Sequence, residues 1–132
     1  MERIRRFFRS RRGQSLVETT LILPLLLLLT GGAIDVARVF NSQISITNAA
    51  REGARAGSHF PTKDWYIIEA VEDELTGSAV PPDDVEIAID LIDGSAEGGH
   101  PIRVIVACDC PTIVGGLFGM PEITLRSAND MV

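Results

Sequence analysis

The chain has 132 residues, 45% of them hydrophobic, and a formal net charge of −6 at pH 7. This length allows one small domain beside one membrane segment, but not two ordinary domains. Six arginines against one glutamate give residues 1–13 a charge of +5, which leaves −11 for the rest of the chain. Because these arginines directly precede an apolar run and form no extended basic face, we expect no nucleic-acid partner.

A long apolar run follows the arginines. Residues 19–34 carry no charge and are rich in leucine. A helix from Ser15 to Ile34 would span about 30 Å, which is one hydrocarbon thickness. A core helix of a soluble protein would show polar residues at every third or fourth position. The run therefore predicts a transmembrane helix over residues 14–37, bent or locally unwound at Pro24 because proline lacks a backbone donor.

The arginines also predict the orientation of this helix. Basic residues beside a span stay in the cytoplasm, so residues 1–13 form a cytoplasmic leader and the acidic body, residues 58–132, lies outside the cytoplasmic (inner) membrane. A cleavable secretory signal is an alternative, because Gly31 and Ala33 would suit a signal peptidase. The run is longer than a usual signal, however, and its helical pattern continues past Ala33. In either case the acidic body leaves the cytoplasm.

The helical pattern continues outside the membrane over residues 38–57, with one apolar and one polar face. Near its start Asp35 and Arg38 are three residues apart and can pair along one face. A stripe of small residues with a spacing of four consists of Ala49, Gly53 and Gly57. Such a stripe lets another element approach closely, although Gly53 could instead merely weaken the helix near its end.

The acidic body is expected to be α+β. A short helix is predicted over about residues 65–75, with an N-cap at Thr62 or Asp64. Alternation with a period of two then indicates three antiparallel strands, at residues 85–91, 102–107 and about 122–128. We expect Ile123 and Leu125 of the last strand to be buried, and the apolar, glycine-rich segment before it to be a packed loop or short helical turn. The small sheet would rest on the outer half of the long helix.

The body offers few residues for catalysis. His59 and His100 lie close to prolines, without further histidines or cysteines at metal-ligand spacing, so we expect a structural or solvated role for both. No paired carboxylates stand out for acid–base work. We therefore expect neither an enzyme nor a metal or other cofactor.

Cys108 and Cys110 are the sharpest chemical feature of the chain. On a strand their side chains project to the same face about 6–7 Å apart, beyond comfortable disulfide reach. Three interpretations stay open. A local disulfide across Asp109 would suit an oxidising compartment if Pro111 bends the chain, whereas two buried thiols would act as small apolar side chains. A redox or metal site would need a C-x-x-C motif or further ligands.

Three segments carry a family resemblance: "RRGQSLVETTLILPLLLLL", "GGAIDVARVF" and "ITNAAREGARAG". A basic leader that ends in glycine, with a glutamate five residues later in an apolar helix, resembles type IV pilins and pseudopilins. With all three segments in register, residues 11–57 resemble the TadE-like family, the pilin-like proteins of the tight-adherence (Tad/Flp) pilus and secretion system. The positions that carry the resemblance are Gly13, Gln14, Glu18, Asp35, Arg38, Asn48, Ala49, Ala50, Arg51, Glu52, Gly53 and Arg55.

The resemblance implies a pilin-like fold and a processing step. A prepilin peptidase would cut between Gly13 and Gln14, removing the arginines and exposing an amine that is often methylated in this family. Glycine suits such a cut because no side chain obstructs the approach to the backbone. Glu18 would then lie in lipid about one turn from the new N-terminus, where a neighbouring subunit's amine would neutralise it. Alternatively, Glu18 lies close enough to the helix end to snorkel to the interface.

The function implied is structural: a minor pilin or pseudopilin that takes part in assembly of a Tad-type pilus or secretion system. Its partners would be the prepilin peptidase, other pilins and the assembly-platform proteins, in a hetero-oligomer. The major pilin typically has tyrosine where Thr19 stands, which argues against that role, as does the large acidic body. A different class of function is an unprocessed, membrane-anchored extracytoplasmic binding module. A third is an extracytoplasmic thiol oxidoreductase that uses Cys108 and Cys110.

Overall fold

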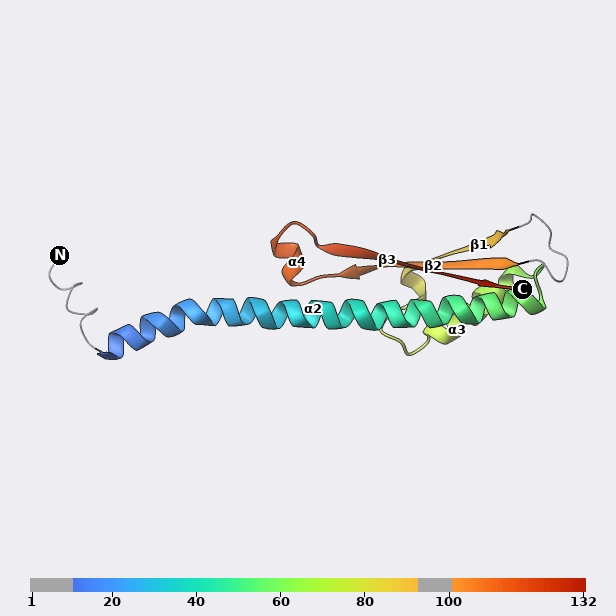
Figure 1. Ribbon diagram of the computed structural model, residues 1–132. Helices are drawn as coiled ribbons and strands as arrows, with labels where there is room; N and C mark the ends of the chain where they lie inside the picture. Colours follow the sequence, from blue (N-terminus) through green and yellow to red (C-terminus); the bar gives the residue numbers. More distant parts are fainter. Residues whose placement is uncertain (1–10, 93–100) are drawn as a thin grey trace.

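The computed structural model describes residues 11–92 and 101–132, with side chains from Gln14 onward. Its elements are α2 (Arg11–His59), α3 (Asp64–Leu75), the 3-10 helix η1 (Pro82–Asp84), β1 (Val85–Leu91), β2 (Ile102–Pro111), α4 (Val114–Leu117) and β3 (Glu122–Met131). Figure 1 shows α2 as a long rod, with the sheet and α3 packed along its C-terminal half. This arrangement confirms the predicted α+β class, with one long helix, one short helix and a three-stranded antiparallel sheet.

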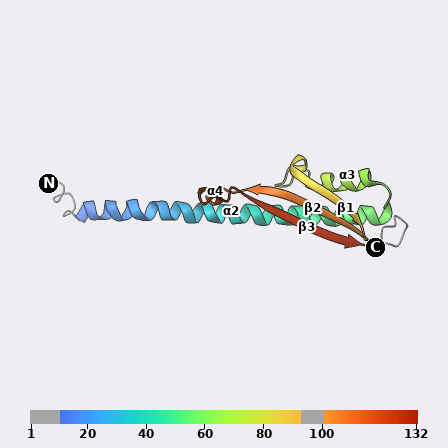
Figure 2. The same cartoon turned by 90° about the horizontal axis from the view of Figure 1, so that it is seen from above.

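The long helix α2 has 49 residues, which corresponds to about 73 Å at helical rise. Pro24 lies inside it, and every residue from Arg11 to His59 is helical, so the helix has no unwound stretch at the proline. The view from above in Figure 2 shows the same division as Figure 1. The N-terminal half of α2 projects alone. The sheet and α3, which we call the domain, cover the other half.

The sheet has the strand order β1-β2-β3, with both pairs antiparallel. Cys108 of the central strand β2 lies between Val85 of β1 and Leu125 of β3. Alternate residues of β2, from Ile102 to Cys110, are buried on the face that packs against α2. The period-two pattern predicts this face because successive side chains of a strand point to opposite sides of the sheet.

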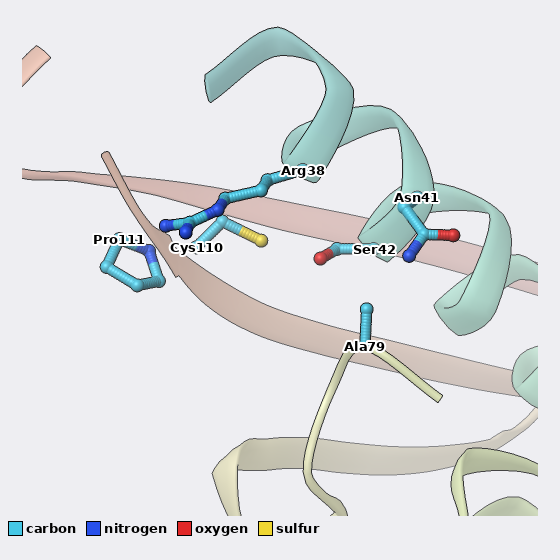
Figure 3. Close-up of a pocket in the computed structure, with 6 residues that line it drawn as sticks. All are labelled: Arg38, Asn41, Ser42, Ala79, Cys110 and Pro111. Atoms are coloured by element: carbon cyan, nitrogen blue, oxygen red, sulfur yellow. The ribbon is translucent and has the colours of Figure 1, made fainter. Parts of the chain in front are cut away.

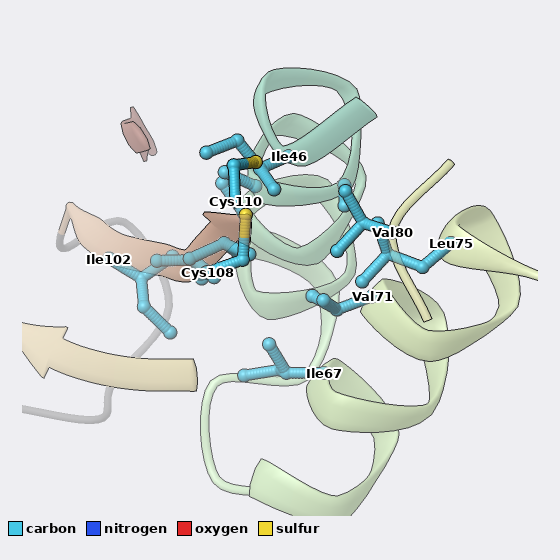
Figure 4. Close-up of a cluster of buried hydrophobic side chains, with 13 residues drawn as sticks. Ile46, Ile67, Val71, Leu75, Val80, Ile102, Cys108 and Cys110 are labelled. Atoms are coloured by element: carbon cyan, nitrogen blue, oxygen red, sulfur yellow. The ribbon is translucent and has the colours of Figure 1, made fainter. Parts of the chain in front are cut away.

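The hydrophobic core lies between this face of the sheet, the C-terminal half of α2 and α3 (Figure 4). Its largest fully buried side chains are Ile46, Ile67, Leu75, Ile102, Val71, Val104 and Val106. Burial of an aliphatic side chain of this size stabilises a fold by about 1.5–3 kcal/mol. The domain is therefore held on α2 chiefly by apolar contacts.

The small-residue stripe of α2 is a point of close approach. A Cβ atom on Gly53 would lie 2.6 Å from Val71 Cγ2 and 3.1 Å from Val104 Cγ1. A Cβ atom on Gly57 would lie 2.8 Å from Ile102 Cδ1. Both α3 and β2 thus pack directly onto the helix backbone, which confirms the close-approach interpretation of the stripe.

Two details of strand β3 differ from the sequence prediction. The strand continues to Met131, beyond the expected end near Ala128, because its last residues pair with the beginning of β2. Ile123, expected to be buried, is 42% exposed because it lies at the start of an edge strand, while Leu125 is half-buried and packs against the core.

The beginning of α3 differs too. Lys63 is its N-cap residue and has no capping side-chain hydrogen bond, so neither Thr62 nor Asp64 caps the helix. The Lys63 ammonium lies 4.7 Å from the centre of the Phe60 ring, a favourable cation–π distance. Asp64 is the first residue of α3, where its negative charge interacts favourably with the helix dipole.

Candidate functional site

The N-terminal half of α2 presents its apolar side chains to the surroundings. From Gln14 the helix is long and apolar enough to cross a membrane. Its large exposed apolar side chains in this half are Leu16, Val17, Leu21, Ile22, Leu23, Leu25, Leu26, Leu27, Leu28, Leu29 and Ile34. Such a surface suits lipid, and the chain is consistent with a single-pass membrane protein.

The threonine hydroxyls of this half form hydrogen bonds within the helix itself. The hydroxyls of Thr19, Thr20 and Thr30 each donate a hydrogen bond of 2.8–3.0 Å to the backbone carbonyl four residues earlier. In hydrocarbon a polar group without a partner is costly. These bonds therefore let the three threonines face lipid without an unpaired hydroxyl proton.

Glu18 is the only charged residue between Gln14 and Ile34, and its side chain is exposed. The Gly13–Gln14 peptide bond lies in the first turn of α2, which begins at Arg11. The candidate processing bond and Glu18 thus lie on one continuous helix, a little over one turn apart.

Asp35 joins α2 to the segment that follows β2. Its side chain is only 8% exposed. The N–H of Ile113 donates to Oδ1 at 2.8 Å, and those of Val114 and Gly115 donate to Oδ2 at 2.7 Å and 3.4 Å. Backbone N–H groups at the start of a helix lack partners within it, so the carboxylate satisfies the first turn of α4. We call this contact the Asp35–α4 junction.

Arg38 does not form the expected ion pair with Asp35, whose oxygens are occupied by α4. Its side chain instead lines a half-open hollow of about 280 Å³ between α2, β2 and the loop after α3. The lining residues are Arg38, Asn41, Ser42, Ala79, Cys110 and Pro111. Figure 3 shows the guanidinium group extending from α2 across Cys110 and Pro111.

The "NAAREGAR" segment, residues 48–55, has some side chains in the core and others on the surface. Ala49, Ala50 and Gly53 are buried in the core, whereas Asn48 and Arg51 are exposed. The domain therefore packs on this segment of α2, and the small side chains of the segment let α3 and β2 come close to the helix backbone.

The polar face of this segment carries one ion pair. Arg55 Nη2 lies 2.7 Å from Glu52 Oε1, one helical turn away. The hydrogen bonds from Arg55 hold the pKa of Glu52 below its usual value. The pair is solvent-exposed, so it adds little to stability.

Cys108 and Cys110 are free thiols on the inner face of β2, each 5% exposed. Burial, with the neighbouring Cys110, raises the pKa of the Cys108 thiol to about 11, which opposes the thiolate that redox or metal chemistry needs. Within the described part of the chain no three His, Cys, Asp or Glu residues gather to hold a metal. His59 is exposed at the end of α2, and His100 lies outside the described residues.

Sequence reasoning missed two polar contacts that fix β3 on the helix. Ser127 Oγ donates to Thr47 Oγ1 at 3.2 Å, and Asn129 Nδ2 donates to the Thr47 carbonyl at 3.4 Å. The available signal was the presence of polar residues at inward positions of the last strand. The Asp35–α4 junction was also missed, because its two halves are 78–80 residues apart.

Comparison with known proteins finds a match to a protein family. No curated protein and no solved structure matches the chain. The match covers about a third of the chain, from the glycine at the candidate processing bond to Arg55, and includes Glu18 and Asp35. The resemblance predicted from the sequence is confirmed: residues 13–55, which form most of α2, match the model of the family described as TadE-like protein.

Proposed function

We propose that this protein is a minor pilin or pseudopilin that takes part in the assembly of a Tad-type pilus or secretion system. The observation that carries the proposal is the division of α2 within its TadE-like segment. One half is an exposed apolar helix with a single carboxylate, and the other half is covered by a small domain. A helix with these two halves is suited to pack its free half against equivalent helices while its domain faces outward.

Processing would prepare the free half for this packing. Cleavage between Gly13 and Gln14 removes the arginines that hold the N-terminus in the cytoplasm and creates an amine at Gln14. An isolated carboxylate in lipid is costly, so Glu18 gains from pairing with the amine of a neighbouring subunit. The helix then tolerates Glu18 best in the assembled state, and the pair sets the register between neighbours.

The partners follow from this role. A prepilin peptidase acts on the leader from the inner face of the cytoplasmic membrane, and other pilins and platform proteins bind the processed helix in a hetero-oligomer. The protein lies in the cytoplasmic membrane or in the pilus, with its domain outside the cytoplasm. The role is structural and needs no catalytic group: the two thiols lie in the core on the inner face of β2.

The test is the mass of the protein in cells that express a Tad-system prepilin peptidase. We expect the wild type to lose its first thirteen residues, and Gly13→Leu to keep them because a bulky side chain obstructs the peptidase. Gly32→Leu is the matched control, since a Cβ atom there would meet no atom within 4 Å, and it should be processed normally. A full-length wild type would favour the unprocessed binding module, and cleavage after Ala33 would favour a secretory signal.

A further inference from the structure

The loop between β2 and β3 forms an apolar tip. Residues 111–121 contain no charged side chain, and we call this segment the α4 tip. Its exposed large side chains are Ile113 at 54%, Leu117 at 72%, Phe118 at 69% and Met120 at 62%. Contiguous apolar patches on a protein surface mark interaction sites.

The α4 tip lies beside the apolar half of α2. A Cβ atom on Gly31 would lie 2.6 Å from Val114 Cγ2, so α4 contacts α2 within the uncharged run of residues 19–34. The Asp35–α4 junction fixes the tip at this height along the helix. Figures 1 and 2 show α4 at the end of the sheet that is nearest the free half of α2. A membrane crossed by residues 15–34 therefore has its outer boundary at the tip.

Most backbone N–H groups of the α4 tip have a hydrogen-bond acceptor, either within the tip or at Asp35 of α2. The N–H groups of Thr112 to Gly115 donate to the Pro121 carbonyl and to Asp35. Those of Phe118 to Met120 donate to carbonyls within α4, and the Thr112 hydroxyl donates to the Met120 carbonyl at 2.6 Å. An N–H group without a partner is costly near hydrocarbon, and these bonds remove that cost for the N–H groups concerned.

We propose that the α4 tip inserts into the membrane leaflet next to the domain, with Leu117, Phe118 and Met120 in the acyl-chain boundary. Three observations select lipid over a protein partner: the absence of charge, the position at the end of the membrane run, and continuity with the exposed apolar surface of α2. Together α2 and the tip then hold the domain at one height and one rotation on the bilayer. The inference goes beyond the proposed function and rests only on α2 spanning the membrane.

The test is depth-dependent quenching of tryptophan fluorescence by brominated lipids. Trp65 is the only tryptophan of the chain, so Trp65→Phe gives a silent background for the full-length protein in phosphatidylcholine vesicles. Phe118→Trp reports on the tip and Leu23→Trp on the middle of the span. Ile92→Trp, 44% exposed just after β1, is the control far from the membrane.

The expected result is a blue-shifted Phe118→Trp emission that bromines near the headgroup quench more strongly than bromines near the chain end. Leu23→Trp should show the reverse order, and Ile92→Trp should be unaffected. If Leu23→Trp is quenched but Phe118→Trp behaves like Ile92→Trp, the tip stays in water and this proposal fails while the span stands. A blue shift of Phe118→Trp without bromine quenching would place a protein surface on the tip and overturn it too. Absence of quenching at Leu23→Trp would remove the span and the proposal together.

Discussion

At the scale of single residues, Asp35 and the first turn of α4 each supply what the other lacks. A buried carboxylate is costly unless it is paired or hydrogen-bonded, and the first N–H groups of a helix have no acceptor within it. Three such groups point at one carboxylate in this protein. The acid therefore fits next to the apolar run, and the loop is fixed to the helix.

Replacement of Asp35 should release the α4 tip. We expect Asp35→Ala to leave three N–H groups without acceptors, a local loss of about 2–4 kcal/mol from the strength of hydrogen bonds to charged groups. Asp35→Asn keeps one acceptor oxygen and should fall in between. Amide hydrogen exchange at Ile113, Val114 and Gly115 measures the effect, with Asp83→Ala, an exposed acid in η1, as the control. Exchange as slow in Asp35→Ala as in the wild type would contradict the junction.

The cysteines should behave as core thiols. We expect an alkylating reagent to spare the folded protein near neutral pH, and to add two groups when the chain is unfolded without reductant. Because burial raises the pKa of Cys108 from 9.0 to about 11, the folded state keeps its proton to higher pH than the unfolded chain. The contribution of Cys108 to the free energy of unfolding should therefore be constant below about pH 9 and be lost as the pH rises toward about 11. No added group after unfolding would instead show a disulfide.

At the scale of elements, the two halves of α2 lie in different environments: the N-terminal half is exposed and apolar, and the C-terminal half packs against the domain. Its free half is surrounded by leucine side chains, whereas its covered half uses small residues so that α3 and β2 come within contact of the backbone. Apolar burial and close packing hold the domain there. The exposed Glu52–Arg55 pair lies within α2 and the exposed Arg103–Asp130 pair lies within the sheet, so neither joins the domain to the helix.

Gly53 should be sensitive to any larger side chain. A side chain there meets Val71 and Val104, so Gly53→Leu should lower the free energy of unfolding by about 1–3 kcal/mol through overpacking. Thermal unfolding of the full-length protein in detergent, followed by circular dichroism, measures the change. Gly32→Leu adds the same side chain to the same helix at a position where a Cβ atom meets no atom within 4 Å, and it should unfold like the wild type. Equal midpoints for both variants would show that α3 and β2 do not rest on Gly53.

At the scale of the whole molecule, the elements were predictable because each carries its own periodic pattern. The apolar run, the amphipathic continuation and the alternating strands each encode their structure within a few adjacent residues. β1 occupies the predicted residues, and α3 begins one residue early.

The contacts between elements were harder to predict. Within α2 the nearest possible partner of Asp35 in the sequence is Arg38. The backbone of Ile113 and Val114 reaches Asp35 only because β2 runs back along α2, and the sequence pattern of the helix does not show this. The exposure of Ile123 likewise depends on which strand lies at the edge, which alternation alone does not reveal. The candidate site on the free half of α2 was predictable because it lies on one continuous helix.

The proposed role in pilus assembly depends above all on whether Glu18 is needed for assembly rather than for insertion. Removal of its charge should ease entry of the helix into lipid but delete the partner of a neighbour's amine. The measurement is co-purification of the protein with the pilus machinery, normalised to its abundance in the membrane, for Glu18→Gln beside Glu86→Gln, which removes an exposed charge from β1. We expect Glu18→Gln to be inserted at least as well as the wild type yet to be lost from the complex, while Glu86→Gln assembles normally. Co-purification of Glu18→Gln at the wild-type level would contradict the proposed role and leave Glu18 as a residue near the helix end.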